Sequence, residues 1–179
     1  LEIRTWVKQL GASFGAPRPL VDVGPLRECY ARKAYTEMVG LMLKPMKLQD
    51  ISLRVGYVKS GGPAQAPAWV ETPRPMPAFG TPAFKQLKLT MYLRKTFVEE
   101  SSFQVLVMAK SHELSHIVLN SIGHPLNLVE PAVDLTAMYL GFRQAFITPN
   151  EFEFEESDTT TRIRPEVLNK LEQMFGRKI

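Results

Sequence analysis

The chain has 179 residues, of which 45% are hydrophobic and 22% are charged, and these values are typical of one globular domain with a substantial core. A single cysteine, Cys29, excludes an internal disulfide, and no apolar run approaches the ~20 residues of a membrane span. We therefore expect a cytoplasmic protein without a membrane segment. The net charge of +4 comes from scattered Lys and Arg, so composition does not favour a nucleic-acid partner, although it does not exclude one.

The first clear pattern along the chain is helical. We expect residues 1–23 to form an N-terminal extension and residues 24–179 to form a single domain. At its start, "GPLRECYARKAYTEMVGLML" (24–43) places apolar side chains at helical spacing. Pro25 suits a first helical position, and Pro45 lies just beyond the end. The stretch predicts one amphipathic helix that packs against the core.

Two alternating patterns follow, separated by a long segment rich in proline. Apolar side chains alternate with polar or small ones in "LQDISLRVGYVKS" (48–60) and in "KQLKLTMYLRKTF" (85–97), which predicts two strands of a small sheet. Residues 61–82 between them contain six prolines, so we expect a long loop without regular structure over most of its length. This loop could fold over the site as a lid or present a polyproline segment to a partner, and a passive surface loop is an equal alternative.

Helical patterns return in the second half of the chain. The stretch 99–122 is apolar on nearly all sides, which predicts a buried central helix that Gly123 ends. A second helix is expected from about Pro131 to residue 146. The acidic stretch "EFEFEES" (151–157) has the alternation of a strand, and Pro165 is placed to begin a C-terminal amphipathic helix. These elements together predict an α+β fold.

The central helix carries "HELSH", in which His112 and His116 are four residues apart. Two histidines at this spacing project from one face of a helix, one turn apart, so both rings can reach a single metal ion. Glu113 lies about 100° further around the helix, where its carboxylate can take a proton from a water molecule in the open coordination position. The motif predicts a Zn²⁺ site with Glu113 as general base.

A catalytic zinc site needs a third protein ligand, and the sequence offers two. His124 follows His116 by eight residues, beyond the helix-ending glycine, whereas Glu130 follows it by fourteen residues at the start of the next helix. The metzincin pattern H-E-x-x-H-x-x-G-x-x-H places its third histidine six residues on, which argues against His124. We favour Glu130 and keep His124 as the alternative.

Asp134 supports the choice of Glu130. It lies four residues later and therefore on the same face of the helix, where it can accept a hydrogen bond from a ligating histidine. The competing explanation is a capping box, in which Asn127 caps the helix and Glu130 only closes its first turn. Pro131 disfavours that explanation because proline is most comfortable at the first helical position.

"HELSH" followed by a helix with "EPAVD" is similar to the gluzincin class of zinc metallopeptidases. The motifs cover residues 112–134, and the architectural likeness extends over residues 24–145. The resemblance implies a zincin-like fold with His112, His116 and Glu130 as zinc ligands. It also implies Glu113 as base, Asp134 as the partner of a histidine, and an edge strand that pairs with an extended substrate. We expect the strand around Leu87–Leu93, within residues 85–97, to fill this role, and an ordinary core strand is the alternative.

The resemblance further implies a Tyr or His donor that stabilises the oxyanion, and no residue fills this role clearly. Tyr139 is nine residues past Glu130 and should point away from the metal, which leaves His124 and Tyr92 as candidates. We therefore expect a zinc metallopeptidase that acts on a peptide or protein substrate. The alternative is a zincin-like regulatory module that binds a peptide or protein without cutting it.

Overall fold

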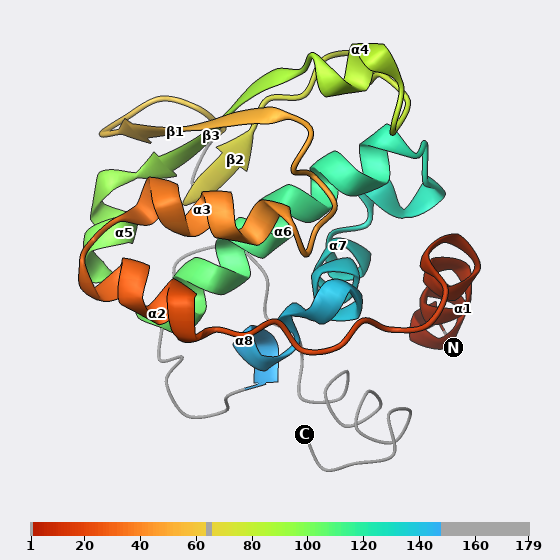
Figure 1. Cartoon of the computed structure of the whole chain (residues 1–179), viewed down its shortest axis with the longest axis horizontal. Helices are drawn as coiled ribbons and strands as arrows, with labels where there is room; N and C mark the ends of the chain where they lie inside the picture. Colours follow the sequence, from red (N-terminus) through yellow and green to blue (C-terminus); the bar gives the residue numbers. More distant parts are fainter. Residues whose placement is uncertain (1, 64–65, 148–179) are drawn as a thin grey trace.

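The computed structural model describes residues 2–63 and 66–147. Within these residues the protein is a mixed α+β structure, in which a small sheet packs against helices (Figure 1). The elements, in chain order, are α1 (Glu2–Phe14), α2 (Gly24–Ala31), α3 (Tyr35–Leu43), β1 (Ser52–Val58), β2 (Ala68–Val70), α4 (Pro82–Lys85), β3 (Lys88–Arg94), α5 (Lys95–Glu100), α6 (Phe103–Ser121), the 3₁₀ helix η1 (Pro125–Leu128), α7 (Glu130–Ala137), the π-helix η2 (Met138–Phe142) and α8 (Gln144–Ile147).

Both predicted strands are present, but the second does not lie at an edge. The strand order is β1-β3-β2, with β1 parallel and β2 antiparallel to β3. The assignment of residues 85–97 to an edge strand is therefore wrong, because β3 is the central strand. Sequence alternation shows which face of a strand is buried and gives no information about its neighbours. The edge strands are β1 and β2, and β2, which is antiparallel to β3, is formed inside the proline-rich segment.

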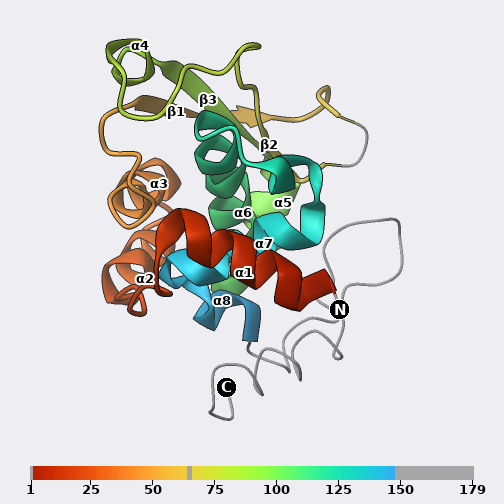
Figure 2. The same ribbon diagram turned by 90° about the vertical axis from the view of Figure 1, so that its right-hand side faces the viewer.

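Helix α6 passes between the sheet and α7, as two perpendicular views agree (Figures 1 and 2). Alternate residues of β3 are buried on the side of this helix, namely Leu89, Met91 and Leu93. On its other side α6 packs along α7, and near β3 it also touches β2. The helix is apolar nearly all round because it is enclosed in this way. This position brings α6 into contact with both β2 and α7.

The stretch 24–43 forms two helices instead of the single helix that its apolar spacing predicts. Lys33 adopts a left-handed conformation with φ of 56°. The backbone N–H of Lys33 donates to the Tyr30 carbonyl, and that of Ala34 donates to the Cys29 carbonyl. These two bonds form the usual helix-ending motif, which normally contains glycine at the left-handed position. A lysine there gave no sign of the break.

The central helix also begins later than its sequence pattern predicts. Residues 95–100 belong to α5, and the extended backbone of Ser101 separates α5 from α6. Ser102 then caps α6, since its side chain accepts a hydrogen bond from the Val105 N–H. At the other end, Gly123 adopts a left-handed conformation with φ of 60°, as expected.

The proline-rich segment 61–82 is mostly irregular, as predicted, but it is held by one arginine of β3. The Arg94 Nε donates to the Ala66 carbonyl at 2.7 Å. Its Nη2 donates to the carbonyls of Gly61 and Pro63 at 3.0 and 3.2 Å. The same guanidinium lies 5.5 Å from the centre of the Trp69 ring. Arg94 therefore fastens the chain just before and within the edge strand β2.

Helix α1 lies in the range 1–23, where we expected an N-terminal extension. Its Leu10 is fully buried and belongs to the main hydrophobic core. The Tyr139 hydroxyl donates to the Gly15 carbonyl directly after the helix. The predicted strand at 151–157 and the C-terminal helix from Pro165 fall outside the described residues. Among the helices that the structure describes, none is long and apolar enough to cross a membrane.

Candidate metal centre

Helix α6 brings the first two candidate ligands together. His112 and His116 are one turn apart on the face toward α7, and their rings meet edge to face with centroids 4.8 Å apart. The two Nε2 atoms are 3.2 Å apart. The side chains of His112 and His116 are 10% and 20% exposed, respectively. Packing therefore holds both rings, and a small part of each remains accessible to solvent. The spacing "HxxxH" therefore produces two convergent nitrogens.

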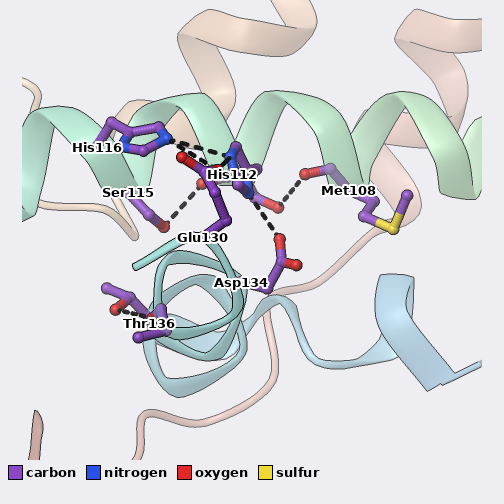
Figure 3. A network of polar contacts seen from close by, with 9 residues as sticks. Met108, His112, Ser115, His116, Glu130, Asp134 and Thr136 are labelled. Carbon is purple, nitrogen blue, oxygen red and sulfur yellow. Dashed lines mark hydrogen bonds and ion pairs between the residues drawn. The ribbon is translucent and has the colours of Figure 1, made fainter. Parts of the chain in front are cut away.

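Helix α7 adds a carboxylate oxygen to this pair. Glu130 is its first residue and Pro131 follows in the first turn, while Val129 occupies the cap position without a side-chain bond. The Glu130 Oε2 lies 3.0 Å from the His112 Nε2 and 3.6 Å from the His116 Nε2 (Figure 3). The Glu130 side chain is 63% exposed, which leaves the cluster open to solvent on that side.

These three residues can hold a metal ion. One ligand atom from each of His112, His116 and Glu130 lies within 4.8 Å of the other two. Two imidazole nitrogens and a carboxylate oxygen are a donor set that suits divalent transition metals. A metal ion placed between them could accept the lone pairs of the two Nε2 atoms and of the Glu130 Oε2. These three atoms lie 3.0 to 3.6 Å from one another. The geometry of the three ligand atoms thus fits a metal site.

Asp134 fixes the ring of His112 from behind. Its Oδ1 lies 2.7 Å from the His112 Nδ1, and the carboxylate is almost fully buried (Figure 3). Glu130 and Asp134 are one helical turn apart on α7, so a single helix face contacts both nitrogens of the same ring. A proton on Nδ1 that is held by Asp134 leaves the Nε2 lone pair directed toward the cluster.

The close carboxylates determine the charge of His112. Burial disfavours a charge on this ring, but the hydrogen bonds to Asp134 and Glu130 outweigh that penalty and raise the pKa of His112 to about 10. The hydrogen bond with His112 lowers the pKa of Glu130. Burial and the neighbouring positive charge of His112 lower the pKa of His116. In the metal-free protein, a proton on His112 therefore takes the place of a cation.

Glu113 lies about 100° around α6 from His112 and does not belong to the group of converging ligand atoms. Burial raises the pKa of Glu113 to about 7, while the nearby His112 ring and a backbone hydrogen bond from Val70 oppose that rise. Val70 is the last residue of β2, so the carboxyl group lies between the histidines and the edge strand. A carboxyl group with this pKa can exchange a proton near neutral pH.

Two contacts of the centre were not anticipated from the sequence. His116 forms a hydrogen bond with the backbone of Asn127 in η1. The Asn127 side chain does not cap α7, because its Nδ2 donates to the Asn120 Oδ1 at 2.7 Å. Glu113 likewise meets the backbone of Val70. Backbone partners leave no signature in residue type, so only the fold could reveal them.

The other candidate residues are engaged elsewhere. The buried ring of His124 stacks on Phe14 with centroids 6.5 Å apart, and its Nδ1 accepts a hydrogen bond from the Leu126 N–H. Tyr92 lies on the sheet face that points away from α6, where its ring stacks on Trp69. The structure therefore does not bring His124 or Tyr92 to the cluster. Tyr139 points toward the segment after α1, consistent with the expectation that it faces away from the metal.

No family model, curated protein or solved structure matches this chain. What the described residues establish is a mixed α+β protein in which two histidines and a glutamate, brought together by α6 and α7, form a candidate metal site.

Proposed function

We propose that this chain is a zinc metallopeptidase with a zincin-like fold, which hydrolyses peptide bonds with Glu113 as general base. The observation that carries the proposal is the convergence of His112, His116 and Glu130 beside a fourth ionisable group that is not one of them. A site that only held a structural ion would have no use for Glu113. Zinc suits a donor set of two imidazoles and one carboxylate, with a further position left open.

When bound, zinc acidifies a water molecule and polarises the carbonyl of the scissile bond. Glu113 accepts the proton of the attacking water and delivers it to the departing amine. The pKa of Glu113, raised by burial to about 7, is suited to both transfers near neutral pH. Asp134 holds His112 in one tautomer, so that the ring presents Nε2 throughout the reaction.

The outer edge of β2, which pairs with no further strand among the described residues, is suited to hold an extended peptide. The Arg94 N–H donates to the Pro67 carbonyl, so the Pro67 and Arg94 positions form a bonded pair between β2 and β3. Backbone groups alternate along an antiparallel strand, and those of Ala68 and Val70 therefore point away from β3. Because Val70 also meets Glu113, a peptide that pairs with this edge would lie beside the base. We assign substrate pairing to β2 in place of β3.

The gluzincin resemblance supports the same interpretation. It requires a first helix with "HExxH" and a second helix with a glutamate and an aspartate four residues apart, and α6 and α7 carry these residues at one contact. An antiparallel edge strand beside the first helix agrees with a peptide-cutting cleft. The short connection between the two helices would make this a compact member with an open site.

A non-catalytic peptide-binding module is the second candidate. The observation that favours it is the placement of His124, Tyr92 and Tyr139, each of which is engaged away from the cluster. Such a module would keep the β2 edge and the metal without a donor for the oxyanion. Both candidates predict metal binding, and they differ in whether Glu113 is needed for a reaction.

The Glu113→Gln variant distinguishes the two. Glutamine removes the base but has the size of glutamate and keeps one oxygen that can accept a hydrogen bond. Zinc content and thermal stability should therefore stay at the wild-type level. Hydrolysis of a quenched fluorescent peptide library should fall by at least ~10²-fold, the lower end of what a positioned base contributes. If the zinc-loaded wild type cuts no peptide, the binding module is correct. If Glu113→Gln loses zinc, Glu113 is a ligand and the mechanism is wrong.

A further inference from the structure

The two histidines of the cluster are held by different kinds of partner. The His112 ring is held by a buried carboxylate on a helix, whereas the His116 ring bonds to the backbone of Asn127. Asn127 lies in η1, a single 3₁₀ turn between α6 and α7, and the adjacent Leu128 is 84% exposed. Short 3₁₀ turns are weakly stabilised by their own hydrogen bonds. The orientation of His116 therefore depends on how firmly this turn is held.

A side-chain hydrogen bond ties the turn back to α6. The Asn127 Nδ2 donates to the Asn120 Oδ1 at 2.7 Å, and both side chains are partly shielded from solvent. Asn120 follows His116 by four residues, so it lies one turn further along the same face of α6. These contacts form a closed loop of three steps. The His116 imidazole bonds to the Asn127 backbone, the Asn127 side chain bonds to Asn120, and one turn of α6 connects Asn120 to His116.

We propose that Asn120 and Asn127 are positioning residues for His116. The amide pair holds the Asn127 backbone against the imidazole and so directs the His116 Nε2 at the ion. The proposal rests on the proposed function, because it assumes that zinc binds at His112, His116 and Glu130. A backbone carbonyl brings no net charge, so the contribution of this partner lies in orientation, and orientation requires a fixed turn.

The rival explanation is that the amide pair only stabilises the end of α6. Both explanations predict a lower melting temperature when the pair is broken, so stability cannot separate them. Affinity for zinc and the visible absorption spectrum of the Co²⁺-loaded protein can, because that spectrum reports the geometry of the ligands. The Asn120→Ala and Asn127→Ala variants remove one amide each, and Gln104→Ala is a control at another partly exposed polar position of α6.

We expect each alanine variant to bind zinc ~10–100-fold more weakly in a chelator competition, the range typical of partners that orient a ligand. The double variant should be no weaker than the worse single variant, because the two amides act as one unit. Both single variants should alter the Co²⁺ spectrum. Gln104→Ala should leave affinity and spectrum at the wild-type values.

A second set of variants keeps the size of the side chains, in case truncation prevents folding. Asn120→Asp and Asn127→Asp each leave one amide donor opposite a carboxylate, so each can retain a hydrogen bond across the pair. The two changes together place acceptors opposite each other and break it. We expect near wild-type affinity and spectrum from each single variant and loss of both properties in the double variant. Added negative charge alone would strengthen cation binding, so a loss reports orientation.

Two results would overturn the proposal, and they have different meanings. If the wild type binds zinc and the alanine variants and the double aspartate variant match its affinity and Co²⁺ spectrum, the amide pair has only a structural role. The metal site itself would then stand. If the wild type binds neither Zn²⁺ nor Co²⁺, the proposed function fails and the positioning role fails with it.

Discussion

The two sides of helix α6 bury ionisable groups in different ways. On the side toward α7, the rings of His112 and His116 and the carboxylate of Glu130 converge on one point. On the opposite side, about 200° around the helix from His112, the Lys110 side chain is fully buried. Among the residues that the structure describes, no carboxylate lies within salt-bridge distance of Lys110.

Lys110 is surrounded by groups that cannot neutralise it. Its Nζ lies 3.3 Å from the Met38 Sδ and 5.0 Å from the centre of the Tyr35 ring. Burial lowers the pKa of Lys110 to about 8, a shift comparable in size to that of the catalytic candidate Glu113. A shifted pKa therefore accompanies burial on both sides of the helix. Convergence of several donor atoms is what distinguishes the candidate site.

The largest difference between the two sides should appear when the third ligand is removed. Glu130→Ala leaves only two protein ligands, so zinc affinity should fall by more than ~10²-fold, beyond the loss expected for an outer partner. His124→Ala is the matched control, because His124 was the alternative ligand and its ring is engaged with Phe14 and Leu126. Competition with a chelator measures both. Loss of zinc in His124→Ala but not in Glu130→Ala would invert the assignment.

Asp134 should have the next largest effect. Asp134→Ala removes the carboxylate that orients His112, and zinc affinity should fall by ~10–100-fold without being abolished. Asp134→Asn keeps the size of the side chain, and its oxygen can still accept from Nδ1, so it should lose less. If both variants bind zinc as tightly as the wild type, the 2.7 Å contact does not contribute to the site.

The dependence of zinc binding on pH tests the electrostatics of the α7 side. The pKa of His112 is raised to about 10 in the metal-free protein, and zinc requires the neutral ring, so the ion competes with one proton. Apparent affinity should rise by up to ~10-fold per pH unit between about pH 7 and 9. Calorimetry in buffers of different ionisation enthalpy should show about one proton released per ion. Affinity that is flat over this range would contradict the assignment of charge.

The same shift acts on the stability of the metal-free fold. A folded pKa above the ordinary value of 6.5 means that His112 stabilises the fold fully below about pH 6.5. This contribution is lost as the pH rises through about 10. Thermal unfolding of the metal-free protein should therefore occur at lower temperature at pH 9 than at pH 6. His112→Ala should weaken this dependence.

The smallest effect is expected on the opposite side of α6. Lys110→Met replaces a buried ammonium that has no carboxylate partner among the described residues with an apolar side chain of similar length, which should raise stability by on the order of 1–3 kcal/mol at pH 7. The gain should shrink as the pH rises from about 8 toward 10.5, because the pKa of the folded lysine is lowered and the wild type already becomes neutral there. Zinc affinity should not change. A destabilised variant would mean that the charge of Lys110 has a partner or a role.

The contrast between the two sides also shows what sequence could predict. The spacing of His112, His116, Glu130 and Asp134 follows helical geometry, so the converging residues could be selected from their positions along the chain. Strand alternation likewise identified the buried face of β3. Helix α7 begins at Glu130, one residue before the expected start at Pro131, because Val129 occupies the cap position.

The rest depends on contacts between segments distant in sequence. The position of β3 in the sheet is set by β2, which lies in a segment that its prolines marked as irregular. The roles of Asn120 and Val70 depend on a side-chain amide and a backbone amide that approach only after folding. The break between α2 and α3 uses a left-handed lysine, where glycine would have been the recognisable signal.

The zinc content of the purified chain, measured after loading and desalting, tests whether His112 and His116 hold the ion. Elemental analysis should find about one Zn²⁺ per chain in the wild type and almost none in the variant that combines His112→Ala with His116→Ala. The Lys110→Met variant should match the wild type, since its side chain lies on the other side of α6. A double histidine variant that keeps full zinc occupancy would show that the ion does not bind at His112 and His116.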